Sequence, residues 1–358
     1  MASQSIEIRN LYKIFGPSSR KLMKLVENGM SKADLNKEHG HILGLKDINI
    51  SIPGGCITVI MGLSGSGKST LIRHINRLID PTSGEVLYGG TDVCKMNEGT
   101  LREFRRHKTA MVFQKFGLLP HRTVLQNTVY GLEIQGVAKA ERETRAELWI
   151  NRVGLDGFSN HYPNQLSGGM QQRVGLARAL TNDADILLMD EAYSALDPLI
   201  RVDMQTVLLD LQKELKKTVV FITHDLDEAL RLGDKIAILR DGEVIQQGTA
   251  TDIVLNPAND YIEAFVKEVN RGRVIQVDAV MQPWRTGAVP VPTAVTIASG
   301  TSIEEALKLL AAHRDTDTAI LGPAGQPMGM VSFNHLVAAM VGSHSPSEGE
   351  TAPTSASI

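Results

Sequence analysis

Two patterns of apolar and polar positions recur along the chain. Residues 5–10 and 46–52 alternate apolar and polar side chains, as strands with one face in water do. The stretches ITVIMG at 57–62 and ILLMDE at 186–191 instead begin with short, largely apolar runs, which are typical of strands buried on both faces of a parallel sheet. We therefore predict an α/β fold that has a parallel core and an antiparallel β edge.

The segment between the first two strands shows a helical pattern. Apolar residues recur at helical spacing over 22–26, and Ser31 with Asp34 resembles a capping box, which commonly starts a helix. We predict an insertion of two short helices at about residues 17–43.

The pattern changes from about Val274 onward. A proline-rich segment that includes Pro283, Pro290 and Pro292 precedes a strand, and it is followed by the helical run SIEEALKLLAAH and by the strands TAIL and MGMVS. The final residues, 343–358, are small and polar, a composition that cannot form a core. We predict a small C-terminal α/β module at 273–342 and a disordered tail at 343–358.

Composition excludes several classes of protein. The chain of 358 residues has 37 basic and 40 acidic side chains and a net charge of −3, so nucleic acid is not an expected partner. Cys56 and Cys94 form no metal-spaced or redox pair, which argues against a disulfide framework. Because there is no apolar run of roughly 20 residues and no apolar core in MASQSIEIRN, we expect neither a membrane span nor an export signal.

The first chemical motif is GLSGSGKST at 62–70, between the strand ITVIM and the helical run TLIRHINRL. It fits G-x-x-x-x-G-K-[ST], in which glycines let backbone amides turn toward phosphate oxygens and the helix N-terminus adds partial positive charge. Lys68 would reach the outer phosphates, and Ser69 could bind magnesium. The alternative is a flexible glycine turn with no ligand.

The second motif is ILLMDEAYSALD at 186–197. Its apolar run delivers Asp190 and Glu191 to the carboxyl end of a central strand, where α/β sheets bind their ligands. Asp190 would hold magnesium through water, and Glu191 would polarise an attacking water molecule. The alternative is that both are solvated charges at a strand end.

The third motif is QLSGGMQQR at 165–173, a glycine-rich turn that leads into a helix. Together the three motifs resemble the ATP-binding cassette (ABC) ATPases, and this one resembles their signature sequence. In that family two cassettes pack head to tail, and the signature contacts the γ-phosphate held by the opposite phosphate loop. The resemblance implies that Ser167, Gly168 and Gly169 complete the ATP site of a partner, as outward-pointing amides at a helix start could do.

Other family positions can be carried over individually. Gln114 in MVFQKFGLLPH matches the glutamine that senses the γ-phosphate, and His224 in VVFITHDLDEA matches the switch histidine. Asp197 matches the loop that crosses the dimer seam. Phe15 in YKIFG matches the aromatic residue that stacks on adenine, with Tyr12 as the competing candidate.

The resemblance therefore implies ATP and Mg²⁺ as ligands and a defined set of site residues. Glu191, His224 and Gln114 would be catalytic, and Ser69, Gln114 and Asp190 would bind magnesium. ATP would be bound by Phe15, Gly62, Ser64, Gly65, Ser66, Gly67, Lys68, Ser69, Thr70, Ser167, Gly168, Gly169 and Asp197.

Within the family, residues 4–272 are similar to ATPases of glycine betaine/proline-type importers, so we assign 1–272 to the ATPase domain. In that subgroup a pair of cystathionine-β-synthase (CBS) modules commonly follows, and residues 274–341 resemble one such module. Its nucleotide-binding pattern G-h-h-[ST]-x-x-D is matched by Gly329 and Ser332 but has His335 at the aspartate position. Imidazole cannot provide the bidentate acceptor that a ribose diol requires.

The function implied is the ATPase subunit of an osmoprotectant importer, working as a homodimer on the cytoplasmic face of the inner membrane. A separate permease and a soluble substrate-binding protein would complete the system. We expect Phe116, Leu118 and Leu119 to contribute to the groove that receives a permease helix, because they are too apolar for a loop in water. The alternatives are import of another amine or amino acid, such as histidine, or a non-transport cassette ATPase.

Overall fold

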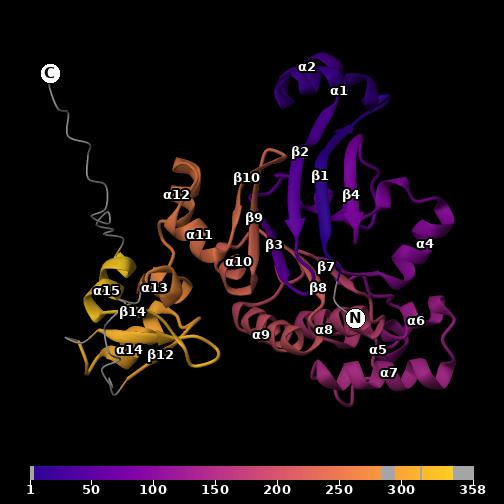
Figure 1. The fold of residues 1–358 in the computed structure, drawn as a ribbon. Coiled ribbons are helices and arrows are strands. Elements are labelled where there is room, and N and C mark those ends of the chain that lie inside the picture. The colour runs from indigo at the N-terminus through magenta and orange to yellow at the C-terminus, as the bar shows by residue number, and fades with distance from the viewer. Residues whose placement is uncertain (1–3, 284–294, 315–316, 342–358) are drawn as a thin grey trace, which may run out of the picture. The chain divides into compact units, whose positions relative to one another are not determined.

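The structure is a computed structural model that describes residues 4–283, 295–314 and 317–341. The chain divides into two compact units, residues 1–253 and 254–358, whose elements are labelled in Figure 1. The predicted tail at 343–358 and the prolines at 290 and 292 lie outside the described residues. Within the described ranges, every helix is too short or too polar to cross a bilayer.

A six-stranded sheet forms the centre of the first unit. Its order is β10 (Glu243–Gly248), β9 (Lys235–Arg240), β3 (Ile57–Met61), β8 (Thr218–Thr223), β7 (Ile186–Asp190) and β6 (Thr109–Val112). All neighbouring pairs are parallel except β9 with β10. Every residue of β3, β7 and β8 is buried, as their apolar runs predicted. Because Met61 lies beside Thr223 and Asp190 beside Ile222, the residues that follow these three strands meet at one edge of the sheet.

The predicted antiparallel strands belong to a sheet of their own, with the order β2 (Ile42–Ile52), β1 (Ile6–Phe15), β4 (Ser83–Tyr88) and β5 (Thr91–Asp92). The parallel sheet has β10 as its antiparallel edge. Ile8 and Ile48 of the antiparallel sheet join Ile60 and Ile222 of the parallel sheet, and Leu71 of α3 (Lys68–Ile75), in one hydrophobic core. Alternation predicted the half-burial of these strands, but it carries no information about which strands they pair with.

The predicted insertion consists of η1 (Ser19–Leu22), α1 (Met23–Glu27) and α2 (Lys32–His39), at the ends of β1 and β2 (Figure 1). Ser31 caps α2, because its Oγ accepts a hydrogen bond from the Asp34 amide at 3.1 Å. Met23, Val26 and Leu35 pack in a small cluster of buried residues that also contains Ile14 and Leu43. Two short α-helices, α1 and α2, thus lie in the segment where the sequence pattern indicates them.

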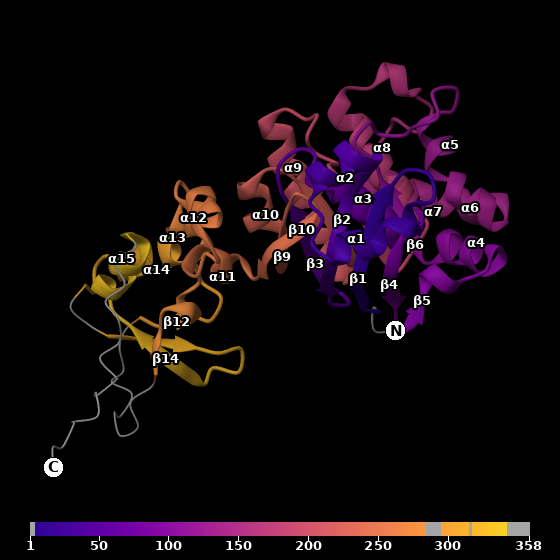
Figure 2. The same ribbon diagram turned by 90° about the horizontal axis from the view of Figure 1, so that it is seen from above.

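A helical subdomain gathers on one side of the first unit (Figure 2). It contains α5 (Val124–Thr128), α6 (Tyr130–Gln135), α7 (Lys139–Arg152), η3 (Pro163–Gln165) and α8 (Gly168–Thr181). Helices α5, α6 and α7 all contact α8, which begins within the third sequence motif. The other helical elements of this unit are η2 (Val93–Lys95), α4 (Glu98–His107), α9 (Pro198–Leu215), α10 (Leu226–Leu232) and α11 (Ala250–Leu255), the last of which runs into the second unit.

The second unit is a small α/β module. It contains α12 (Asp260–Val266), α13 (Arg271–Val274), η4 (Val277–Ala279), β11 (Gln282–Pro283), β12 (Ile297–Ala298), α14 (Ile303–Leu310), β13 (Thr318–Leu321), β14 (Pro327–Val331) and α15 (Phe333–Val341). The sheet order is β11-β14-β13-β12. The unit begins at residue 254, whereas the predicted boundary lies at 272/273. Residues 271–275 belong to the second unit because α13 contacts α14 and α15, and because the Ile303 amide donates to the Ile275 carbonyl.

The residues of the incomplete CBS pattern lie on and next to β14. The His335 amide donates to Ser332 Oγ at 3.2 Å, so the serine hydroxyl serves the first turn of α15. A Cβ atom on Gly329 would lie 2.7 Å from the Gln282 carbonyl oxygen, which gives this glycine a packing role. The identity of the unit as a CBS-like module stays a prediction.

Candidate nucleotide-binding site

The phosphate-binding motif lies in the turn between β3 and α3. Gly62, Gly65 and Gly67 have positive φ angles of 152°, 79° and 104°. At Gly62 a Cβ atom would lie 2.2 Å from the Leu239 carbonyl oxygen, so no other residue fits there. The Ser66 side chain is buried, and its Oγ has no hydrogen-bond partner among the described residues, whereas Ser64 is exposed. A buried hydroxyl without a partner is what a loop built to hold phosphate oxygens would contain.

Lys68 begins α3 and is only 4 % exposed. Its Nζ donates to the Gly62 carbonyl at 2.8 Å and to the Leu63 carbonyl at 3.0 Å. Burial lowers the pKa of Lys68 from its usual value, while Glu191 and Asp190 oppose that shift. The ammonium group of Lys68 is therefore held within the turn between β3 and α3 by two carbonyl groups and the adjacent carboxylates.

Asp190 lies at the end of β7 and is hydrogen-bonded to Ser69, another of the predicted magnesium ligands. Ser69 Oγ donates to Asp190 Oδ1 at 2.8 Å, and Arg73 Nη2 lies 3.3 Å from Asp190 Oδ2. A hydroxyl and a carboxylate oxygen are hard ligands of the kind that Mg²⁺ selects, and magnesium usually takes only one or two carboxylates from the protein. These residues fit the expected ion. Arg73 was not among the predicted site residues.

Glu191 is the point on which the other predicted catalytic residues converge. Its carboxylate accepts a hydrogen bond from Gln114 Nε2 at 3.0 Å, and it lies 3.8 Å from Lys68 Nζ and 3.7 Å from His224 Nδ1. Its backbone has φ of 47°, and its amide donates to the Ile222 carbonyl on the neighbouring β8 at 3.2 Å. The structure thus brings together four residues that are widely separated in the sequence.

Ser194 is a further neighbour of Glu191 that the sequence analysis missed. Its Oγ donates to the Glu191 carbonyl at 3.0 Å and lies 3.5 Å from Gln114 Nε2. The motif ILLMDEAYSALD places it within the same turn, but nothing in the sequence distinguishes its hydroxyl from that of a surface serine.

The signature residues lie at the start of α8 rather than beside the phosphate loop. Ser167 is the N-cap residue, and its Oγ accepts from the Met170 amide at 3.3 Å. Ser167 and Gly168 are exposed, and a Cβ atom on Gly169 would lie 2.6 Å from Ile200 Cγ2. Asp197, also exposed, precedes α9 and makes no side-chain hydrogen bond as its N-cap.

The two aromatic candidates for adenine stacking have different surroundings. Phe15, at the end of β1, is 37 % exposed, and its ring lies over the backbone of Gly44, where a Cβ atom would come within 2.7 Å of Phe15 Cε2. Lys13 Nζ lies 5.0 Å from the centre of the Phe15 ring. Tyr12 is half-buried and packs against the apolar cluster of the insertion. The accessible ring is therefore that of Phe15.

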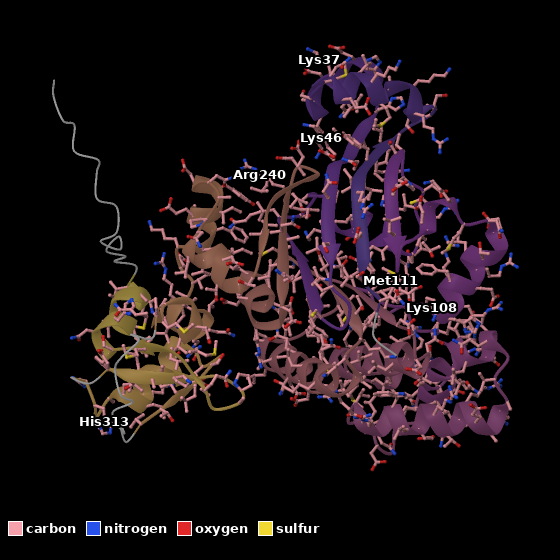
Figure 3. The ribbon with its side chains drawn as sticks, viewed as in Figure 1. Lys37, Lys46, Lys108, Met111, Arg240 and His313 are labelled. Atoms are coloured by element: carbon pink, nitrogen blue, oxygen red, sulfur yellow. The ribbon has the colours of Figure 1, made fainter. Side chains whose placement is uncertain are left out.

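Residues 113–123, which join β6 to α5 and contain Gln114, form the Gln114 loop. A cavity of about 300 Å³ lies near this loop. Its lining includes Phe113, Leu119, Tyr130 and Arg178, together with Met111 of β6, which is labelled in Figure 3. Of the three apolar loop residues predicted to form a groove, Leu119 lines this cavity. Phe116 instead lies against α8, where a Cβ atom on Gly168 would be 3.7 Å from Phe116 Cζ.

Comparison with known proteins agrees with these features. The sequence matches the family described as ABC transporter over residues 45–194. The chain is 54 % identical to the glycine betaine transport ATP-binding protein OpuAA of Bacillus subtilis over 78 % of its own length and 67 % of that protein. It is 47 % identical to the glycine betaine/proline betaine transport system ATP-binding protein ProV of Salmonella typhimurium over 94 % of its own length and 82 % of that protein.

A solved structure supports the same assignment. The dimeric structure of the bacterial ABC transporter cassette MJ0796 superimposes with a TM-score of 0.58 at 36 % identity, covering 68 % of this chain and 98 % of that one. With the phosphate loop, Asp190 and Glu191 at one sheet edge and the signature at the start of α8, the chain belongs to the ABC transporter family of ATP-binding proteins.

Proposed function

We propose that this chain is the ATP-hydrolysing subunit of an ABC importer for glycine betaine and related quaternary amines. The observation that carries the proposal is the convergence of Lys68, Gln114 and His224 on the carboxylate of Glu191, beside the Ser69–Asp190 pair. The names of the relatives OpuAA and ProV support the choice of glycine betaine.

In this proposal each residue has a defined task. Lys68 and the amides of the phosphate loop bind the phosphates of ATP, and Phe15 stacks on the adenine. Ser69, Asp190 and Gln114 would hold Mg²⁺, which neutralises charge on the outer phosphate oxygens. Glu191 orients the attacking water and accepts its proton, while His224 contacts the γ-phosphate. The hydrogen bond from Gln114 to Glu191 keeps the carboxylate at the mouth of the loop.

The exposed parts of the site support a proposal for the partner proteins. Ser167, Gly168 and Asp197 are free to face a second copy of the chain, and the dimeric cassette MJ0796 supports a homodimer closed over two ATP molecules. The cavity lined by Phe113 and Leu119 would receive a helix of a membrane permease. The chain would then work at the cytoplasmic face of the inner membrane, with a soluble binding protein that delivers the amine.

One experiment tests the shared ATP site. A Lys68→Ala chain keeps an intact signature, and a Ser167→Arg chain keeps an intact phosphate loop, so a mixture can assemble one complete site from two defective chains. We expect each variant alone to be inactive and the mixture to recover part of the ATP hydrolysis. An exposed pair of control substitutions, Lys139→Ala and Ser51→Arg, should leave hydrolysis unchanged. Folded variants that show no recovery on mixing would contradict the head-to-tail site.

A second experiment tests the transported substrate. Cells that lack this gene should lose uptake of labelled glycine betaine at high osmolarity and regain it with the wild-type gene, but not with Glu191→Gln. The purified Glu191→Gln chain should still bind ATP, while its hydrolysis falls by roughly a hundred- to ten-thousand-fold, the usual effect of removing a general base. Rescue of another amine or amino acid, without glycine betaine, would contradict the substrate assignment alone.

A further inference from the structure

Arg178 of α8 attaches the Gln114 loop to the signature helix. Its Nη1 donates to the Gly117 carbonyl at 2.6 Å, and its Nη2 donates to the Phe116 carbonyl at 3.1 Å. A guanidinium fork that holds two consecutive carbonyl groups fixes the direction of the chain as well as its position. Arg178 is half-buried, and its bond to the Phe116 carbonyl is partly shielded from water, whereas the bond to the exposed Gly117 is not.

Phe116 lies along the face of α8 that Arg178 shares. A Cβ atom on Gly168 would be 3.7 Å from Phe116 Cζ, and one on Gly175 would be 3.7 Å from the Phe116 carbonyl oxygen. Residues seven apart lie on one face of a helix, and Arg178 follows within another turn. The loop therefore contacts α8 from its first turn to Arg178, through a ring at one end and two hydrogen bonds at the other.

The backbone of this loop is in an unfavourable conformation. Phe116 has φ of 51°, which is rare for a bulky residue without local support. Such strain persists only where surrounding contacts hold it, and it concentrates at functional sites. The loop is also held by the hydrogen bond from Gln114 to Glu191. Glu191 itself has a φ of 47°. The loop thus connects the catalytic carboxylate to the signature helix.

We infer that Arg178 is a positioning residue that holds Gln114 against Glu191 and, through the same bonds, couples the Gln114 loop to the helix that presents the signature. The inference rests on the proposed role of Gln114 in ATP hydrolysis. When the Gln114 loop moves because ATP binds in the same chain, α8 moves with it. The ATP site of this chain and the signature surface that contacts the partner's ATP therefore move together. Releasing the fork frees Gln114 without touching the phosphate loop.

The test is a double-mutant cycle between Arg178→Gln and Gln114→Ala. With Arg178→Gln alone, we expect ATP affinity within about threefold of wild type, since Lys68 is untouched, and kcat lower by roughly tenfold to a hundredfold, as for a misplaced catalytic group. In the Gln114→Ala background, Arg178→Gln should lower kcat by less than about twofold more, because it acts through the residue already removed. Arg178→Lys, which keeps the charge but loses the fork, should be intermediate.

Arg105 provides a matched control. It too donates to two consecutive carbonyl groups, those of Asn76 at 2.9 Å and of Arg77, and Arg77 likewise has a positive φ of 50°. Arg105 lies on α4 and holds the end of α3, so Arg105→Gln should lower the melting temperature while keeping kcat within about threefold of wild type. Phe116→Gly, a change on the loop itself, tests the same coupling if Arg178→Gln does not fold.

Three results would overturn the inference. Arg178→Gln could fold and retain wild-type kcat, it could reduce kcat by the same factor with and without Gln114, or Arg105→Gln could reduce kcat equally. A wild-type chain that hydrolyses no ATP would refute the proposed function, whereas normal wild-type hydrolysis with an unaffected Arg178→Gln would refute the positioning role alone.

Discussion

His74 should make the first unit sensitive to mild acid. It lies on α3, the helix that begins with Lys68 and Ser69, and it is completely buried. Its Nδ1 lies 2.7 Å from the Thr70 carbonyl oxygen, so Nδ1 carries the proton of the neutral ring and Nε2 carries the lone pair. Nε2 has no hydrogen-bond partner among the described residues. Protonation there would place a positive charge in the core with no acceptor to stabilise it.

The magnitude follows from the difference between the folded and unfolded states. Burial lowers the pKa of His74 to about 4, with Lys13 adding to the effect and Asp80 and the Thr70 carbonyl opposing it. In the unfolded chain the pKa is the ordinary 6.5, so the unfolded state binds more protons as the pH falls below that value. The free energy of unfolding is therefore unaffected by His74 above pH 6.5, and it declines because of this group as the pH falls from 6.5 to about 4. Between pH 7.5 and pH 5.0 the free energy of unfolding should fall by about 2 kcal/mol from this group alone.

The assay is urea unfolding at pH 7.5 and pH 5.0, followed by circular dichroism without nucleotide, for wild type and His74→Asn. Asparagine keeps a donor near the position of Nδ1 but cannot become charged. We expect the loss of stability between the two pH values to be about 2 kcal/mol smaller in the variant, whatever its stability at pH 7.5. His39→Asn, a change at an exposed histidine of α2, controls for the replacement of a histidine by asparagine as such. Equal pH dependence in wild type and His74→Asn would refute the reasoning.

Three further predictions concern separate parts of the molecule. Phe15→Ala should weaken ATP binding about tenfold, in line with the loss of one stacking partner. Tyr12→Leu, which removes the aromatic ring but keeps an apolar side chain against the cluster of the insertion, should change ATP binding by less than about twofold. A titration with a fluorescent ATP analogue that gave the reverse order would favour Tyr12 as the stacking residue. Leu119→Asp should abolish uptake in cells while the purified chain keeps its ATPase rate within about threefold, and loss of ATP binding would instead place Leu119 in the cassette core. Deletion of residues 258–358 should leave ATP hydrolysis within about threefold of wild type, since the second unit is separately compact. It should change mainly the response of uptake to ionic strength. A truncated chain that folds but does not hydrolyse ATP would show that the second unit supports the site.

The phosphate-binding motif, Asp190 and Glu191 could be predicted because they come at the ends of buried strands, whereas His224 and Gln114 were predicted from the resemblance to ABC ATPases. Gly62, Glu191 and His224 each come directly after a buried strand, and parallel pairing of β3, β7 and β8 brings the ends of those strands to one edge. A short, largely apolar run in the sequence thus indicates a strand buried on both faces, and the end of that run indicates where the polar residue of the site lies.

Contacts between distant segments could not be predicted in this way. Arg178 reaches Phe116 across 62 positions and Gly117 across 61, and Arg73 reaches Asp190 across 117, so no local pattern marks either arginine. An arginine on a helix has the same appearance in the sequence whether it is solvated or holds a loop. The division into two sheets was missed for the same reason, because half-burial of a strand does not specify the sheet it joins.

The start of α9 gives the signature a structural neighbour that supports its proposed role at a dimer seam. Gly169 lies so close to Ile200 that a Cβ atom would come within 2.6 Å of Ile200 Cγ2, which places the exposed signature turn beside the residues that follow Asp197. Leu199 is 84 % exposed, and Ile200 is also exposed. Adjacent exposed apolar side chains next to polar ones are typical of an interaction surface rather than of a face left in water. The amides at the start of α8 therefore lie beside exposed apolar residues. In the proposed dimer the amides bind ATP held by the second chain, and the apolar residues exclude water around it.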